Sequence, residues 1–290
     1  MNKGLTLSLG LLALAGSAVA ANAADIAARP IYKAPPVMAP AFSWTGCHIG
    51  GNVGWARSEH NLSTVVPSTS NMNGAAVTTI TTAGNTSFDG NGWTGGGQIG
   101  CNWQTGLGIL GGFLVLGVEG DLNFLSANAS RNTGIRTEPQ FGHLYQSIDE
   151  VRMPWLGTAR GRVGVAFGPV LLYGTGGLAA APINITKDFR WDFTDGCPLV
   201  NTLQSCHVGG TSGTRTGWTA GGGIEWAFAP RPFGWSVKAE YLYSDFGSVT
   251  YTTLNRGIIF QPVGAAAPQP ANHTVSTDLH VFRVGLNLLF

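Results

Sequence analysis

Near the end of the chain, apolar residues recur at every second position and alternate with polar or small ones. Successive side chains of a β-strand point to opposite faces, so this spacing predicts a strand with one fully apolar face. Such alternation is typical of strands that cross a bilayer in a closed barrel, with lipid on one side and the lumen on the other. The apolar face holds Phe282, Val284, Leu286, Leu288 and Phe290. We expect the terminal Phe290 to be the signal that outer-membrane assembly machinery recognises on this strand.

Four more segments alternate clearly enough for both faces to be assigned: residues 113–125, 155–167, 218–228 and 235–243. In each of them, apolar side chains occupy one face and charged side chains the other. Because lipid-facing positions of a barrel are apolar, the charged faces are expected to line the interior. With one residue from the last strand, the expected interior charges are Glu119, Asp121, Glu225 and Glu240 together with Arg160, Arg162, Lys238 and Arg283.

The remaining strands are predicted at residues 44–57, 93–104, 277–290 and 170–181, the last with faces too weakly patterned to assign. Short connections rich in glycine or proline lie at residues 105–112, 168–169 and 229–234. Long polar connections lie at residues 59–91, 126–150, 182–213 and 248–276. This order predicts an all-β fold, an eight-stranded antiparallel up-and-down transmembrane β-barrel over residues 43–290. The long loops are expected outside the cell, and both termini in the periplasm.

The start of the chain has the features of a secretory signal peptide. Lys3 precedes an apolar run at residues 5–14, and the small residues that follow include an A-x-A site at residues 21–23. We therefore expect residues 1–23 to be removed, with residues 18–20 as a competing cleavage site. Residues 24–42 are rich in proline, which cannot donate to a β-ladder, so they are expected to form a periplasmic linker.

Composition narrows the class of protein. Charged residues make up 11% of the chain, well under the roughly 25% of ordinary soluble domains. After the signal peptide no apolar segment is long enough for a membrane helix, and a membrane protein without such helices must be a closed barrel. A formal net charge of +1 gives no reason to expect a nucleic-acid partner. The expected surroundings are the lipid and lipopolysaccharide of a Gram-negative outer membrane.

The eight interior charges balance, four acidic against four basic. An eight-stranded barrel has an interior only wide enough for side chains, and buried charges are costly unless they are paired. We therefore expect a hydrogen-bonded ion-pair plug rather than an open pore. A narrow path for protons or ions is the alternative.

Tryptophans near the predicted strand ends suggest the aromatic girdles that flank the lipid-facing band of a barrel. These are Trp44, Trp93, Trp103, Trp155, Trp218, Trp226 and Trp235. A girdle is a better explanation for them than a ligand cage.

Several short motifs together resemble the small eight-stranded outer-membrane proteins of alphaproteobacteria, the family of 25 and 31 kDa surface antigens. They occur in order along the mature chain, at residues 42–46, 50–54, 116–121, 155–162, 173–177, 216–219 and 239–247. The first strand departs from the family pattern at Cys47 and His48, where two aromatic or aliphatic residues are usual. The resemblance implies a structural barrel that displays surface loops.

The chain has four cysteines, and export permits disulfides. Cys197 and Cys206 fall in one predicted extracellular loop and could close a small ring. If Trp44 opposes Gln104 on the next strand, antiparallel register places Cys47 opposite Cys101. Both pairs are therefore disulfide candidates. A metal site at Cys206 and His207 is not favoured, because no second pair of ligands is spaced to complete it.

We expect a non-enzymatic structural protein that supports the envelope, with no cofactor and with a loop partner that the sequence does not identify. A haem-binding or other ligand-binding barrel is the first alternative, since five histidines fall in predicted loops or at the rim: His60, His143, His207, His273 and His280. The second alternative is a narrow porin. An enzyme would need a nucleophile with a base and an orienting group, and no spacing singles out such a set.

Overall fold

The computed structural model describes residues 42–70, 78–137, 144–191, 206–229, 233–255 and 270–290. Eight long strands dominate: β1 Gly46–Ser70, β2 Thr78–Ile109, β3 Gly112–Leu125, β7 Trp155–Phe167, β8 Val170–Trp191, β9 Cys206–Ala227, β10 Gly234–Asn255 and β11 Pro270–Leu289. Three short strands lie between β3 and β7: β4 Ala129–Asn132, β5 Arg136–Thr137 and β6 Leu144–Arg152. In this part of the chain no helix is long and apolar enough to cross a membrane.

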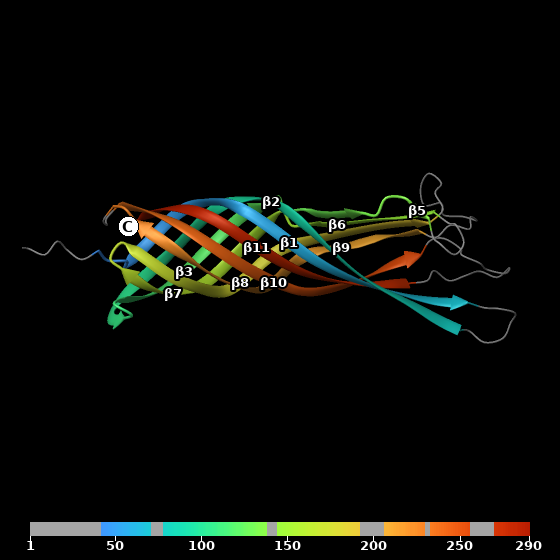
Figure 1. Cartoon of the computed structure of the whole chain (residues 1–290), viewed down its shortest axis with the longest axis horizontal. Coiled ribbons are helices and arrows are strands. Elements are labelled where there is room, and N and C mark those ends of the chain that lie inside the picture. The colour runs from blue at the N-terminus through green and yellow to red at the C-terminus, as the bar shows by residue number, and fades with distance from the viewer. Residues whose placement is uncertain (1–41, 71–77, 138–143, 192–205, 230–232, 256–269) are drawn as a thin grey trace, which may run out of the picture. The chain divides into compact units, whose positions relative to one another are not determined.

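The eight long strands form a closed ring. Each pairs antiparallel with its neighbours in the order β8-β7-β3-β2-β1-β11-β10-β9, and β9 pairs again with β8. The first and last strands meet directly, from His48 opposite Leu289 to Val65 opposite Asn272. Figure 1 shows these strands winding round the barrel toward the end that carries the C-terminus. The predicted eight-stranded antiparallel up-and-down barrel is confirmed.

Apolar side chains form a band on the outside of the ring. In β11 the residues Phe282, Val284 and Leu286 point outward, as the alternation predicts, and Trp93 of β2 is 66% exposed. The faces of β8, which the sequence left open, are now assigned: Leu172 and Leu178 point outward, and Tyr173 points inward. A band of this kind can only lie in lipid.

The predicted strand ends are wrong on the side of the long connections. Many of the residues expected to form polar loops instead continue the long strands: β1, for example, runs to Ser70, and β11 starts at Pro270. The reason is a reversal of the alternation. In the part of β11 that precedes Phe282, the outward residues are polar, such as Asp278, while the inward residues include apolar ones, such as Leu279. This is the pattern of a strand whose outer face meets water rather than lipid.

We call the strand portions on this side of the barrel the extension. It includes the part of β1 that follows Trp55 and the parts of β2 and β11 that precede Trp93 and Phe282. There β6 pairs with β8, from Tyr145 opposite Trp191 to Arg152 opposite Asn184, and β4 pairs with β6. The pairing of β10 with β9 is interrupted between Asp245 and Leu254. Two sheets result, β2-β1-β11-β10 and β9-β8-β6-β4. They share an apolar core that includes Leu62, Val249, Tyr251, Val275, Val151, Met153, Ile183 and Ile185.

The barrel belongs to one compact unit, Ala41–Phe290. The proposed signal peptide and nearly all of the proline-rich linker lie outside the described residues, so both remain predictions.

Candidate functional site in the barrel interior

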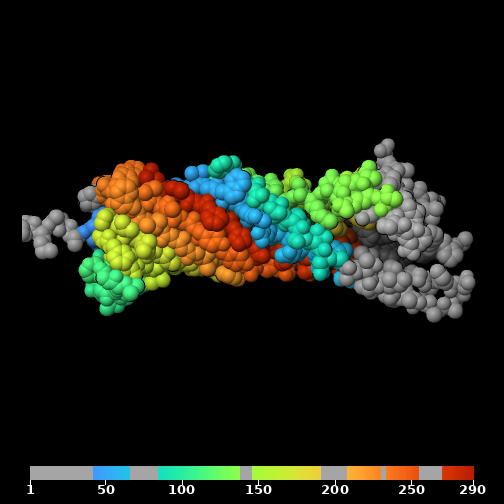
Figure 2. All heavy atoms as spheres, viewed as in Figure 1, coloured from blue at the N-terminus to red at the C-terminus, as the bar shows by residue number. Residues whose placement is uncertain are grey.

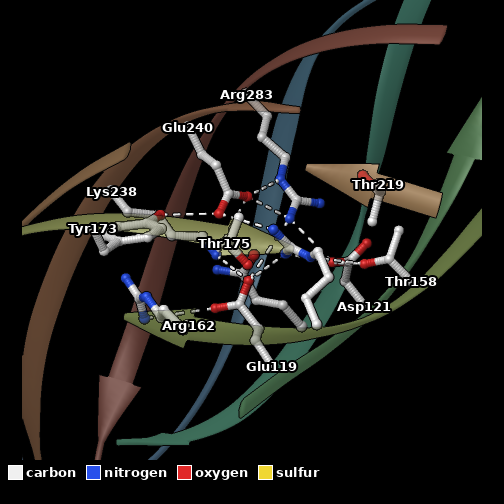
Figure 3. A network of polar contacts seen from close by, with 12 residues as sticks. Glu119, Asp121, Thr158, Arg162, Tyr173, Thr175, Thr219, Lys238, Glu240 and Arg283 are labelled. Atoms are coloured by element: carbon white, nitrogen blue, oxygen red, sulfur yellow. Dashed lines mark hydrogen bonds and ion pairs between the residues drawn. The ribbon is translucent and has the colours of Figure 1, made fainter. Parts of the chain in front are cut away.

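The eight predicted interior charges lie together inside the ring, within the stretch of strand that carries the lipid-facing band. They come from five strands, β3, β7, β9, β10 and β11, and none is more than 8% exposed. Residues two apart on one strand share a face, which is how β3, β7 and β10 each contribute two charges. Figure 3 shows the side chains of Glu119, Asp121, Arg162, Lys238, Glu240 and Arg283 converging on one another across the lumen.

Arg160 occupies the centre of this charge network. Its Nη2 atom lies 2.6 Å from Glu119 Oε1 and 2.8 Å from Asp121 Oδ2, and its Nη1 atom lies 3.0 Å from Glu240 Oε1. One guanidinium therefore joins carboxylates from two strands. A guanidinium has five N–H donors in a rigid fork, which suits it to this bridging position.

Arg283 and Lys238 complete the contacts of the same carboxylates. Arg283 Nε donates to Glu240 Oε2 at 2.8 Å and Nη2 donates to Asp121 Oδ2 at 3.0 Å. Lys238 Nζ donates to Glu119 Oε1 at 2.6 Å. Every carboxylate of the central group thus contacts at least two cations, so none is buried without a counter-charge.

The remaining pair lies to one side of the centre. Arg162 Nη2 donates to Glu225 Oε2, and the guanidinium lies 3.6 Å from the ring centroid of Tyr173. Glu225 also accepts hydrogen bonds from Ser236 Oγ at 2.6 Å and from Asn287 Nδ2 at 3.0 Å. Both carboxylate oxygens of Glu225 therefore accept hydrogen bonds.

Sequence reasoning missed the other polar residues that complete the network. Tyr173 donates to Glu240, Thr158 donates to Asp121, and His48 Nε2 lies 3.2 Å from Glu119. Gln98 extends the chain of contacts from Asn287 to Asn52. The signal was present: Asn287 shares the inward face of Arg283, and His48 alternates with the lipid-facing Ile49.

Below the network, Trp44 closes the barrel at the end of the short turns. It is fully buried, and its indole Nε1 donates to the carbonyl oxygen of Gly168 at 3.0 Å. Its neighbours in this apolar cluster include Val115, Leu171 and Leu289. The expectation that Trp44 belongs to the outer girdle is therefore wrong. It precedes the first strand, so the alternation of β1 does not fix its direction.

Two of the histidines expected at the loops or rim instead lie inside the extension. His60 Nδ1 lies 3.1 Å from Thr277 Oγ1, and His273 lies between Thr64 and Thr253, with a hydrogen bond on each ring nitrogen. Burial lowers the pKa of His60 to about 4, because the charged imidazole is disfavoured away from water. The side chains of His143 and His207 lie outside the described residues.

The structure contains the disulfide between Cys47 and Cys101, which oppose each other on β1 and β2 as the register argument predicted. Cys197 lies outside the described residues, so its pairing with Cys206 remains a prediction. Phe290 points outward, and its backbone exchanges two hydrogen bonds with Cys47, at 2.8 and 2.9 Å. Among the residues with described positions, no three His, Cys, Asp or Glu residues gather as metal ligands.

A closed antiparallel ring with an apolar outer band and a polar interior defines a transmembrane β-barrel protein. The family model described as outer membrane protein beta-barrel domain matches residues 9–288, and the chain belongs to this family. The protein is therefore an outer-membrane protein of a Gram-negative bacterium.

Its relatives agree with the predicted resemblance. The chain is 28% identical to the 31 kDa outer-membrane immunogenic protein of Brucella melitensis, over 94% of this chain and 95% of that protein. It is 27% identical to the 25 kDa outer-membrane immunogenic protein of Brucella abortus, over 84% of each. It is 32% identical to the 22 kDa outer membrane protein of Rhizobium leguminosarum, over 54% of each.

Proposed function

We propose that this outer-membrane barrel is a structural, non-enzymatic and non-conducting protein that supports the envelope and presents its extension to the cell's surroundings. The observation that carries the proposal is the charge network at the level of the lipid. Three of its ion pairs cross the lumen between strands that are not neighbours in the ring: Arg160 with Glu240, Lys238 with Glu119, and Arg283 with Asp121. Ions could pass only by breaking several charge-assisted hydrogen bonds in a site of low dielectric constant.

Two apolar layers support the same conclusion. The cluster around Trp44 fills the lumen below the network, and the core of the extension fills it above. A conducting pore needs a continuous polar path, and both layers place apolar side chains in it, while polar residues buried in the extension, such as His60, are hydrogen-bonded to one another. The proposal therefore disfavours the narrow porin.

The contacts of the histidines argue against the other two alternatives. His60 and His273 are buried and bonded to threonines, so they do not offer imidazoles to haem at the surface. His280 Nδ1 lies 2.8 Å from Tyr241 Oη, while Asp278 accepts a hydrogen bond from Tyr243. His280 and Asp278, the residues that most suggest an acid–base pair, thus each contact a tyrosine. These contacts do not favour an arrangement in which Asp278 orients His280 for catalysis.

An envelope assay tests the structural role. We expect deletion to sensitise cells to detergent, and wild-type protein to restore resistance. Overexpression should leave lipid A and phospholipid species unchanged, and purified protein should cause no shift in the haem Soret band. A changed lipid species or a Soret shift that depends on the extension histidines would overturn the proposal. We also propose lipopolysaccharide as the lipid partner and Phe290 as the contact of the assembly machinery.

A further inference from the structure

One edge of β2 has no partner strand above the lipid band in the described part of the chain. β2 pairs with β1 along its whole length, up to Thr78 opposite Ser70, but it pairs with β3 only from Thr94 to Ile109. The last contacts on the β3 side are at Trp93, whose carbonyl oxygen accepts from Ser126 N and whose N–H donates to Ser126 Oγ. Among the described residues, no strand pairs with this edge beyond that point.

The direction of the backbone groups follows from Trp93. Alternate residues of a strand direct their N–H and C=O groups to the same side. Since those of Trp93 face β3, the groups of Asn91, Asp89, Ser87 and Asn85 face the open edge. The side chains of these four residues point outward and are exposed. The edge therefore presents a row of backbone donors and acceptors beside polar side chains.

The chain that leaves β3 crosses the inner face of β2 instead of covering its edge. A Cβ atom on Gly90 would lie 2.4 Å from the carbonyl oxygen of Asn128, and one on Gly92 would lie 2.4 Å from the carbonyl carbon of Ser126. Only glycine admits a backbone this close. β4 follows this segment and exchanges no backbone hydrogen bond with β2 in the described structure.

The open edge begins where the lipid ends. Trp93 is the last lipid-facing residue of β2, and the outward residues beyond it are polar. Hydrocarbon does not tolerate an open sheet edge, whereas water does. An unpaired edge that is free of lipid is a template for another strand.

We propose that the edge of β2 from Asn85 to Asn91 docks an extended segment of another protein as an added strand. The favoured segment carries small polar side chains and a lysine or arginine opposite Asp89. A groove of about 370 Å³ adjoins the edge on the outer face, and the side chains that line it include those of Asn61, Ser63, Asn85, Ser87, Thr274 and Ser276. Figure 2 shows β1, β2 and β11, the strands of this groove, side by side on one face.

The charges beside the edge explain the preference for a basic residue. Asp89, Glu59, Asp278 and Asp245 lie opposite one another on four adjacent strands. Arg57 is the cation that contacts this row in the described structure. It lies 3.2 Å from Glu59 and 3.7 Å from Asp89. Opposite charges on directly facing residues stabilise strand pairing.

A second copy of this chain does not fit the edge within one membrane. Two copies inserted in the same direction have β2 strands that run the same way across the bilayer, so they cannot pair antiparallel. If a twofold axis along the membrane normal related the two copies, their facing strands, each tilted by about 40°, would cross at roughly 80°. That angle is too steep for strands to pair. The partner is therefore a different chain.

A binding measurement tests this proposal on the refolded protein in nanodiscs. The probe is a labelled synthetic peptide in which Thr and Val alternate around one central Lys, followed by fluorescence anisotropy. We expect saturable binding that is lost when alternate peptide nitrogens are methylated. Ser87→Pro removes an N–H that faces the open edge and leaves the β1 ladder intact, so it should weaken binding about tenfold. Ser87→Ala keeps that N–H and should bind like wild type.

Charge reversal supplies a second test. A peptide with Glu in place of Lys should bind more weakly to the wild type, and Asp89→Lys should reverse the preference. No saturable binding, or equal binding of the methylated peptide, would overturn the proposal even if Ser87→Pro failed to refold. Conductance and envelope resistance report on the structural role separately, because neither requires the edge to be occupied.

Discussion

Glu119 and Arg160 form a 2.6 Å ion pair between neighbouring strands, and the same carboxylate oxygen of Glu119 lies 2.6 Å from Lys238. One acidic side chain thus holds two cations in the interior of the barrel. Removing one member of such a group leaves the other charges buried without compensation, which costs more than the pair contributes when intact.

Glu119→Gln should therefore destabilise the barrel strongly. We expect the free energy of unfolding in detergent micelles, measured by urea titration of tryptophan fluorescence, to fall by about 3–5 kcal/mol. The matched control is Glu150→Gln, since Glu150 pairs with Arg152 at 2.7 Å but the Arg152 side chain is 62% exposed. That loss should stay below about 1 kcal/mol. Equal losses in the two variants would contradict the account of the network.

Trp44→Ala should destabilise the apolar cluster at the end of the barrel that carries the short turns. The fully buried indole leaves a cavity, and its hydrogen bond to Gly168 is lost, so we expect a loss of about 3–5 kcal/mol. Trp103→Ala is the control because Trp103 faces outward. If the two variants unfold at the same urea concentration, Trp44 does not seal the barrel.

His60 should make the extension sensitive to acid. The pKa of His60 falls from 6.5 to about 4 on folding, so between these values the unfolded chain binds a proton that the folded chain does not. The free energy of unfolding therefore decreases as the pH falls from about 6.5 to about 4, by roughly 3 kcal/mol in total. His60→Asn cannot titrate and should flatten this part of a pH series of urea midpoints. An unchanged pH dependence would rule out His60 as its source.

The disulfide between Cys47 and Cys101 should stabilise the barrel by restricting the unfolded chain. The two cysteines are 54 residues apart, for which loop closure predicts roughly 4 kcal/mol. The double variant Cys47→Ser, Cys101→Ser should unfold at lower urea than wild type and should not respond to reductant at this site. Identical midpoints for oxidised and reduced wild type would refute the contribution.

The sequence predicts the lipid-facing part of the fold well because lipid enforces one rule on every strand. Phe282 and Val284 must face out, and their alternation places Arg283 inside without further knowledge. Beyond the lipid that rule reverses, so Leu279 and Val275 are buried in an extension that a search for apolar outward positions takes for loops. The partners of each charge also depend on the closure of the ring. Arg160 meets Glu240 across 80 residues of sequence, and no local pattern links them.

The central claim is that the charge network closes the lumen, and single-channel conductance of the refolded mature chain in a planar bilayer tests it most directly. Heat-modifiable gel migration should first confirm that the barrel has folded. We predict no discrete openings. Stable openings whose ion selectivity changes in Glu119→Gln or Arg160→Gln would contradict the account, because they would make these residues the lining of a pore.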